Sequence, residues 1–203
     1  MTTSTRPLDR PRRGAFSAAD APRYSGVMQA MHWVTVALLC CAYPVAWMID
    51  SAISQPEAAR LLMLHRSFGV AILLMTILRL GIRRQARIPP LPADLPAIQR
   101  VAARASAALL YALLIVQPLL GFAASLLHGD HVVLFGNLEL PVRVTVDKPL
   151  AHRLFELHGW IALALLGLIG LHAAAALHHH FVRKDSVLAG MLPGRRPATV
   201  SRQ

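Results

Sequence analysis

Four histidines lie within the apolar stretches of this chain, at His32, His65, His158 and His172. An ionisable side chain inside a membrane helix is costly and by default marks a functional site. A lone histidine there could equally be a hydrogen-bonded packing residue, so the set matters more than any one member. His158 and His172 are 14 residues apart, which on a helix brings them within about 40° of one face and about 21 Å apart along the axis. One of them therefore lies near each end of the same helix.

The other two histidines fall at matching depths. His32 is about one turn into the first apolar stretch, level with His172, and His65 is about two turns into the second, level with His158. Two imidazoles from separate helices suit an iron porphyrin, which takes one axial ligand from each side. Zinc would need a tetrahedral set of ligands, and no cysteine or carboxylate is placed to complete one. The spacing predicts two pairs of haem-iron ligands, one pair at each membrane face.

Small residues accompany these histidines. Gly69 follows His65 by one turn, Gly159 adjoins His158, and a run of alanines, 173–176, follows His172. Small side chains leave room for a flat macrocycle, but close packing of two helices uses the same residues. Either interpretation is open from the sequence.

The elements that must position these histidines are helices that cross a membrane. The chain has 203 residues, of which 55% are hydrophobic and 15% charged, against about 25% charged in an ordinary soluble domain. The apolar residues form four blocks, at about 27–49, 58–82, 102–127 and 153–181, each long enough to cross a ~30 Å hydrocarbon core. The second block is the weakest, because His65, Arg66 and Arg79 interrupt it. The sequence predicts an all-α fold, an integral membrane four-helix bundle with two b haems between helices, in which the third span serves only for packing.

The segments outside these spans predict three parts. Residues 1–24 form an N-terminal tail without the apolar core of a cleavable signal peptide, residues 25–185 form the membrane domain, and residues 186–203 form a C-terminal tail. In the loop 128–151, segments 132–135 and 142–146 are expected to form a short hairpin or a cap on the membrane surface. Pro44 and Pro118 lie inside spans and are expected to bend them.

The charge distribution predicts the orientation. Sixteen of the 21 Lys and Arg residues lie in the tails, the loop between the second and third spans and the adjoining helix ends, so the two sides of the membrane carry net charges of +12 and −1. The positive-inside rule then places both termini in the cytoplasm. The net charge of +11 therefore follows from the basic residues that set the orientation of a protein embedded in membrane lipid. Nucleic acid is not an expected partner.

The remaining histidines and the two cysteines are less informative. His128 and His131 are expected to be solvated loop residues, and His152 faces away from His172, so His158 is the better ligand. The run 178–180 could bind a metal, handle protons or simply cap a helix at the interface. Cys40 and Cys41 are adjacent on one helix and are expected to be apolar fillers.

Several motifs together resemble the bacterial cytochrome b561 family of di-haem membrane proteins. They are Met31-His32-Trp33, Leu64-His65-Arg66-Ser67-Phe68-Gly69, Glu156-Leu157-His158-Gly159 and the stretch from Gly170 to Phe181 followed by Lys184-Asp185. The resemblance covers about 24–193. The N-terminal tail is longer than is usual in the family, and the outer loop differs.

The resemblance carries expectations about the site residues. It implies that His32 and His172 ligate a cytoplasmic-side haem and that His65 and His158 ligate a periplasmic-side haem. It further implies a quinone site at the cytoplasmic end of the last span, at His179 and Lys184. The last helix is most similar to that of a family member that oxidises superoxide and reduces ubiquinone.

Three functions remain open from the sequence. The first is transfer of electrons from superoxide through two haems to ubiquinone, with Arg66 and Arg153 beside the outer haem attracting an anion or pairing with haem propionates. The second is a cytochrome b electron-transfer subunit that anchors a dehydrogenase or hydrogenase to the quinone pool, for which the short loops leave little docking surface. The third is a small transporter that uses the histidines as a proton relay. A visible spectrum separates the third from the other two.

Overall fold

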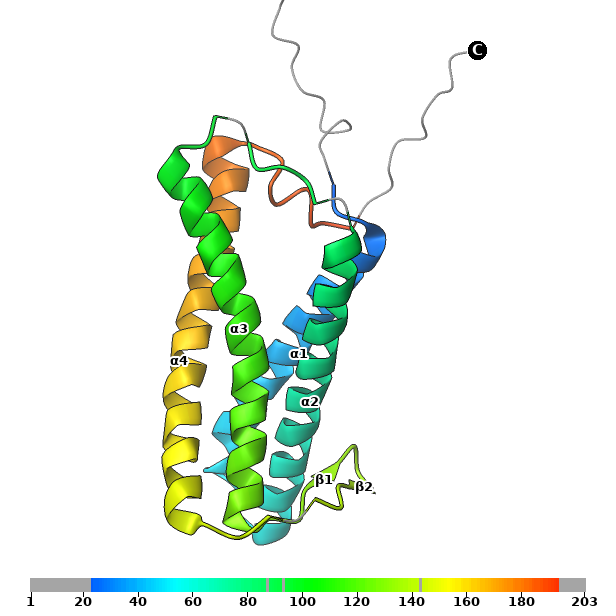
Figure 1. The fold of residues 1–203 in the computed structure, drawn as a ribbon, viewed down its shortest axis with the longest axis vertical. Helices are drawn as coiled ribbons and strands as arrows, with labels where there is room; N and C mark the ends of the chain where they lie inside the picture. Colours follow the sequence, from blue (N-terminus) through cyan, green and yellow to red (C-terminus); the bar gives the residue numbers. More distant parts are fainter. Residues whose placement is uncertain (1–22, 87, 93, 143, 194–203) are drawn as a thin grey trace, which may run out of the picture.

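Four long helices make up the chain in the computed structural model, which describes residues 23–86, 88–92, 94–142 and 144–193. They are α1 (Gly26–Ile49), α2 (Gln55–Gln85), α3 (Ala97–His128) and α4 (Lys148–His178), and α4 continues into a π-helical turn, His179–Arg183. The helices stand side by side as an elongated bundle (Figure 1). The described part of the N-terminal tail, residues 23 and 24, leads directly into α1, and residues 1–22 and 194–203 lie outside the described residues.

Each of the four helices is long and apolar enough to cross a membrane. The sequence prediction of an all-α membrane bundle with four spans is thereby confirmed, including its weakest member, α2. Few side chains are fully buried, because most of the apolar surface faces the region that lipid fills. The small core lies at mid-height, where Ala42, Ile72, Leu114 and Leu165 bring all four helices together.

Side-chain caps set where three of the helices begin. The hydroxyl oxygens of Ser25 and Ser54 accept hydrogen bonds from the third backbone N–H beyond them, at the start of α1 and α2. The carboxylate of Asp147 does the same for α4. Such caps satisfy backbone donors that have no partner within the helix. At the other end of α3, Gly129 adopts a left-handed conformation with φ of 92°, which glycine accepts without a steric penalty.

Helix packing follows the order of the chain: α1 lies against α2, α2 against α3, and α3 against α4. Gly69 of α2 faces Pro118 of α3, and a Cβ built at Gly69 would meet the Cβ of Pro118 at 3.7 Å, an ordinary packing distance. The first and last helices are joined in another way. The hydroxyl of Tyr43 on α1 donates a hydrogen bond of 2.7 Å to the carbonyl oxygen of Ala162 on α4.

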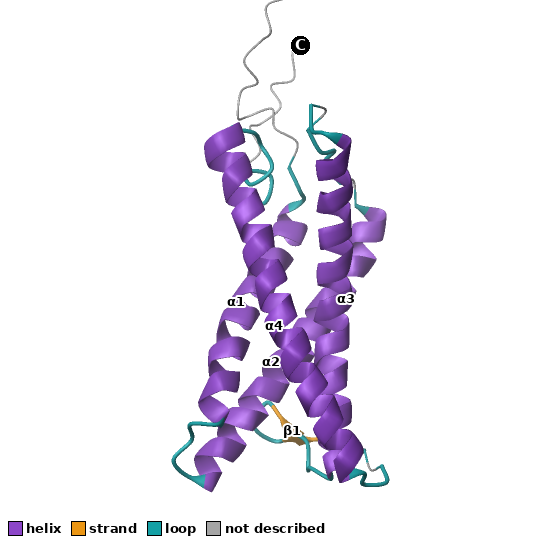
Figure 2. Ribbon diagram, turned by 90° about the vertical axis from the view of Figure 1, so that its left-hand side faces the viewer, coloured by secondary structure: helices purple, strands orange, loops and turns teal. Residues whose placement is uncertain are grey.

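A small hairpin closes one end of the bundle (Figure 2). Strand β1 (Val133–Leu134) pairs antiparallel with β2 (Leu138–Glu139), so the segment 132–135 does form one arm of a hairpin. Of the two alternatives for the segments 132–135 and 142–146, a hairpin between them does not form. Residues 142 and 144–146 lie beyond β2 in irregular backbone. The left-handed backbone of Phe135 and Gly136 turns the chain back after only two residues of strand.

The hairpin also acts as a cap on the helices. Val132 and Leu134 are almost completely buried, and the backbone N–H of Phe135 donates to the Ser67 hydroxyl of α2 at 2.8 Å. The loop is thereby attached to α2 near the end of the bundle at which α2 begins.

The opposite end of the bundle is closed by residues 186–193, which we call the clasp. The clasp runs from the end of α4 to the start of α1, and its backbone carbonyls accept hydrogen bonds there. Gly190 O accepts from the buried side chain of Gln29 at 2.9 Å, and Met191 O accepts from the Trp33 indole at 2.9 Å. Arg23 donates to Ala189 O and Leu192 O. Residues predicted as the start of a tail thus connect α4 to α1.

Substitution of Gln29 tests the clasp. Gln29→Leu removes a buried donor, which typically costs about 1–3 kcal/mol, so the clasp should open more often. Limited proteolysis of purified protein should then cut within residues 186–193 several times faster than in the wild type. The exposed residue Gln55 offers a control, because Gln55→Leu should leave the cleavage rate unchanged.

Candidate functional site

Two of the predicted ligands, His65 of α2 and His158 of α4, face each other in the half of the bundle nearer the hairpin. Their ring centres are 6.1 Å apart and their planes are nearly perpendicular, at 84°. The sequence placed them at the same depth by counting turns, and the structure brings them together. Both line a cavity of about 670 Å³ that α1, α2, α3 and α4 enclose jointly.

Backbone carbonyls hold both imidazoles in the same way. His65 Nδ1 lies 3.1 Å from the carbonyl oxygen of Ala42, and His158 Nδ1 lies 3.1 Å from that of Gln117. A carbonyl can only accept, so each Nδ1 carries the proton and each Nε2 keeps its free electron pair. This is the arrangement that metal-ligating histidines ordinarily have. Gln117 adds a second link, because its amide nitrogen donates to the carbonyl oxygen of His158 at 2.8 Å.

A glycine of α3 makes room for His158. A Cβ built at Gly121 would lie 2.8 Å from Cε1 and 3.0 Å from Nδ1 of His158, closer than carbon atoms in proteins approach one another. The imidazole therefore lies directly against the α3 backbone. The third span thus does more than pack: through Gln117 and Gly121 it positions a candidate ligand.

These residues fit a haem with two axial histidines. An iron between two imidazoles makes two metal–nitrogen bonds of roughly 2 Å, and each nitrogen lies roughly 1 Å from the centre of its ring. The ring centres should therefore be about 6 Å apart. In the structure the ring centres of His65 and His158 are 6.1 Å apart. The cavity also lies in the range of about 300–1,000 Å³ that ligand sites occupy. Among the described residues, no group of three or more His, Cys, Asp or Glu side chains gathers in an arrangement that could hold a metal ion.

The second predicted pair, His32 of α1 and His172 of α4, lies towards the end of the bundle that the clasp closes. Here the hydrogen-bonding partner of His32 is Arg79 of α2, whose Nη1 is 3.2 Å from His32 Nδ1. Arginine can only donate, so Nδ1 accepts and the ring proton is on Nε2. His32 and His172 fit a haem by residue type and by their positions on α1 and α4. The Arg79–His32 hydrogen bond has to break before Nε2 of His32 could bind iron.

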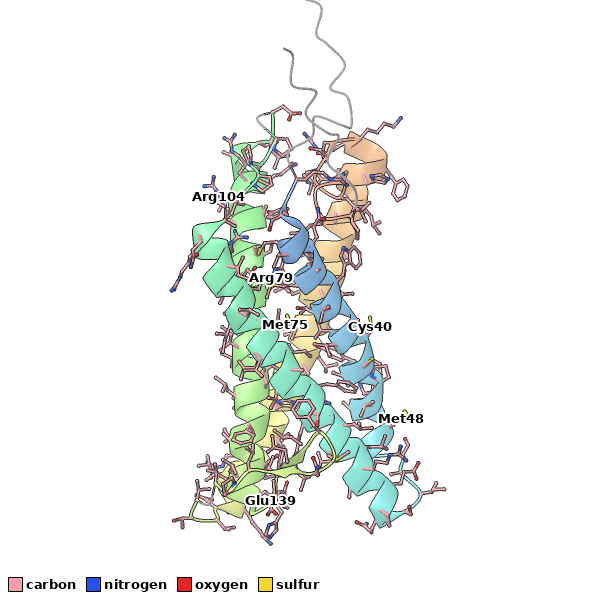
Figure 3. The ribbon with its side chains drawn as sticks, turned by 90° about the vertical axis from the view of Figure 1, so that its right-hand side faces the viewer. Cys40, Met48, Met75, Arg79, Arg104 and Glu139 are labelled. Atoms are coloured by element: carbon pink, nitrogen blue, oxygen red, sulfur yellow. The ribbon has the colours of Figure 1, made fainter. Side chains whose placement is uncertain are left out.

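Two arginines of α2 lie beside these histidines with buried donors. Among the described residues, the Nε atoms of Arg66 and Arg79 are buried and make no hydrogen bond. Arg79 comes from the upper half of α2, far from Glu139 on the hairpin (Figure 3), and its guanidinium lies 5.6 Å above the ring centre of Tyr111. Buried guanidinium donors suit a carboxylate such as a haem propionate.

The two arginines predicted for an anion differ in their surroundings. Arg66 makes an ion pair with Asp130 of the outer loop and donates to Ser125 Oγ at 3.0 Å, so a neighbouring carboxylate already balances its charge. Arg153, near the start of α4, is exposed. Arg153 is therefore the better placed of the two to attract an anion from solution, and Arg66 the better placed to fix the outer loop.

The predicted quinone residues lie where α4 ends. His179 opens the π-helical turn, and Lys184 follows it in a left-handed conformation with φ of 54°. The Nδ1 of His179 is 2.5 Å from a carboxylate oxygen of Asp185, and Arg183 Nε is 3.3 Å from that oxygen. Burial alone would raise the pKa of Asp185, but the hydrogen bonds from His179, the Val187 N–H and Arg183 outweigh it and hold the pKa below its usual value.

The other histidines and the cysteines occupy the surface. His128 and His131 each lie beside a carboxylate of the outer loop, at 2.7 and 3.1 Å, and His152 is paired loosely with Glu156 at 3.4 Å. Cys40 and Cys41 are free thiols on the exposed side of α1.

Some residues of the site carried no obvious signal in the sequence. The carbonyls of Ala42 and Gln117 act through the backbone, which residue type does not reveal. Gly121 could have been found, because it is a glycine inside a span, three residues after Pro118. Asp185 appeared only as part of a motif, and its contact with His179 depends on the π-helical turn.

Comparison with known proteins shows relatives that match nearly the whole chain. The chain is 32% identical over 178 residues to a protein of Yersinia pestis named probable superoxide oxidase CybB, covering 86% of this chain and 98% of that one. It is 29% identical over 172 residues to cytochrome b561 homolog 2 of Escherichia coli K12, covering 84% and 91%. It is 28% identical over 176 residues to cytochrome b561 homolog 1 of the same bacterium, covering 86% and 99%.

The family profile described as prokaryotic cytochrome b561 matches residues 23–194, which include all four helices and the clasp. The resemblance that the histidine motifs indicated is therefore confirmed. The chain belongs to the prokaryotic cytochrome b561 family, membrane proteins that bind haem b and transfer electrons.

Proposed function

We propose that this protein oxidises superoxide on the outer side of a bacterial inner membrane and passes the electrons to ubiquinone on the cytoplasmic side. In this proposal His65 and His158 ligate an outer haem b, and His32 and His172 ligate an inner haem b. Both termini are cytoplasmic. The facing imidazoles of His65 and His158, each with Nδ1 on a backbone carbonyl, are the observation that carries the proposal. The Yersinia pestis relative, named as a probable superoxide oxidase, supports the choice of donor.

The reaction balances as two one-electron oxidations and one two-electron reduction. Two superoxide anions each lose one electron and become dioxygen, and one ubiquinone gains two electrons and two protons and becomes ubiquinol. Bound haem supplies the one-electron centres that join these steps. The residues of the chain supply the rest: Arg153 attracts the anion, the carbonyls of Ala42 and Gln117 orient the outer histidines, and His179 with Lys184 binds the quinone.

The outer loop favours a protein that works alone over one that anchors a dehydrogenase or hydrogenase. Between α3 and α4 the described residues form one small hairpin, β1–β2. It packs on α2 through buried Leu134 and through the backbone N–H of Phe135. Standard protein–protein interfaces need about 800 Å² from each partner, and this short loop offers little of that.

Anaerobic rapid-mixing spectroscopy of the purified, haem-containing protein tests the proposal. Superoxide should reduce the haems within the mixing experiment, and added ubiquinone-1 should reoxidise them. Superoxide dismutase in the first mixture should abolish the reduction. Haems that stay oxidised with superoxide, while a generic reductant such as dithionite reduces them, would refute the proposed donor.

A further inference from the structure

The end of α4 is built around an unusual change in helix geometry. The α-helical pattern stops at His178, the next five residues form a π-helical turn, and Lys184 turns the chain back with a positive φ. The backbone N–H of Asp185 then donates to the carbonyl oxygen of His179 at 3.1 Å. π-Turns of this kind occur at the C-terminal ends of helices, where they change the direction of the chain. Here the turn places the Asp185 carboxylate beside the imidazole of a residue six positions earlier.

The contact between His179 and Asp185 is sheltered, unlike its surroundings. Both side chains are 17% exposed, whereas the flanking His178 and His180 are exposed. The other oxygen of Asp185 accepts a hydrogen bond of 3.1 Å from the backbone N–H of Val187, which lies in the first turn of the clasp. The carboxylate therefore has a fixed orientation with His179 on one side and the clasp on the other.

Arg183 connects this pair to the neighbouring loop. Its Nε reaches Asp185, and its Nη2 donates to Asp94, between α2 and α3, at 2.8 Å. Arg183 Nε and His179 Nδ1 share one oxygen of Asp185, so the guanidinium balances the charge of the carboxylate from beside the imidazole. Since the carboxylate remains ionised at neutral pH, it can only accept, so His179 Nδ1 keeps its proton and Nε2 is left for another partner.

We propose that Asp185 is a positioning residue for quinone reduction: it holds the His179 imidazole so that Nε2 meets a carbonyl oxygen of the quinone. The inference rests on the proposed function. As two electrons reach the quinone, Nε2 takes a proton from cytoplasmic water and passes it to that oxygen, while the ionised Asp185 carboxylate stabilises the positive charge that the imidazole carries in between. The second proton of the quinol comes from water. A carboxylate that orients a histidine and stabilises its charged form acts in this way in other proton-transfer sites.

The test separates the two halves of the reaction in the haem-containing protein. Asp185→Asn should lower the maximal rate of haem reoxidation by ubiquinone-1 by about tenfold or more. This is less than the roughly 10²–10⁴-fold contribution of a positioned general acid, because the variant keeps His179 and loses only what orients it. The half-saturating ubiquinone-1 concentration should change far less, and reduction by superoxide should be unaffected. Asp185→Glu, which keeps the carboxylate, should recover most of the rate. Asp94→Asn removes the same charge from the same face without touching His179 and serves as the matched control.

A second readout does not depend on turnover. In the nitrogen spectrum of protein that contains ¹⁵N-labelled histidine, the His179 signal is identified as the one that disappears in His179→Gln. This signal should show a proton on Nδ1 in the wild type. In Asp185→Asn it should show a mixture of the two tautomers. If Asp185→Asn fails to retain haem, His179→Gln carries the kinetic test and must show the same loss of maximal rate.

The outcomes distinguish the two proposals. Wild-type haems that ubiquinone-1 does not reoxidise would overturn the proposed function and this inference with it. Rapid reoxidation in the wild type, with an equal rate in Asp185→Asn, would overturn this inference alone. If Asp185→Glu is as slow as Asp185→Asn, a carboxylate at this position is not what matters, and Asp185 only maintains the shape of the turn. That result would also overturn this inference.

Discussion

His158→Ala should leave the purified protein with about half of its haem. The substitution removes one of the two imidazoles that meet at 6.1 Å and leaves His65 without a partner across the cavity. A haem with one protein ligand is held far more weakly than one with two, so the outer haem should be lost. The inner pair, His32 and His172, should still hold its haem. Pyridine haemochrome quantitation against protein concentration measures the ratio directly.

Two companion variants make this result interpretable. His152→Ala removes a histidine of the same helix whose side chain is 77% exposed, and it should retain the full complement of haem. The double variant His158→Ala, His172→Ala should retain none. Wild-type haem content in His158→Ala would show that the pairing of His65 with His158 is not a haem site.

Gly121→Ala should disturb the outer haem almost as strongly as loss of the ligand. The added methyl group would lie 2.8 Å from the His158 ring, so either the imidazole or the α3 backbone must move. Movement of the ring breaks the hydrogen bond from Nδ1 to Gln117 O, which fixes the free electron pair on Nε2. We expect lower haem content and, in the haem that remains, a reduction potential shifted by tens of millivolts, measured by spectroelectrochemical titration.

Gly81→Ala is the control for this effect, because a Cβ at Gly81 meets nothing within 4 Å. Alanine is a better helix former than glycine by about 1 kcal/mol, so this variant should keep the wild-type spectrum and potential. If Gly121→Ala matches Gly81→Ala in haem content and potential, the close contact between α3 and His158 is not needed for haem binding.

Helix positions could be predicted closely from the sequence because membrane helices obey one strong constraint. A span must be long and apolar, since the bilayer satisfies no backbone hydrogen bonds. The weak second span confirms this: despite His65, Arg66 and Arg79, it forms α2 without interruption. Helix periodicity also placed His65 and His158 at one depth, because rise per residue is nearly invariant.

The connecting segments could not be predicted in the same way. The expected partner of segment 132–135 was 142–146, since both are apolar, but the tight turn at Gly136 made the nearer residues Leu138–Glu139 the partner. Likewise the clasp contributes only carbonyl oxygens to its contacts with Gln29 and Trp33. Such contacts depend on the path of the backbone and are independent of residue type.

The clasp has a practical consequence for handling the protein. A reporter or purification tag joined after Pro193 preserves the clasp carbonyl oxygens that accept hydrogen bonds from Arg23, Gln29 and Trp33. A tag joined directly after Asp185 removes these carbonyl oxygens. Fusion junctions at those two places, eight residues apart, should therefore give preparations of very different yield and thermal tolerance.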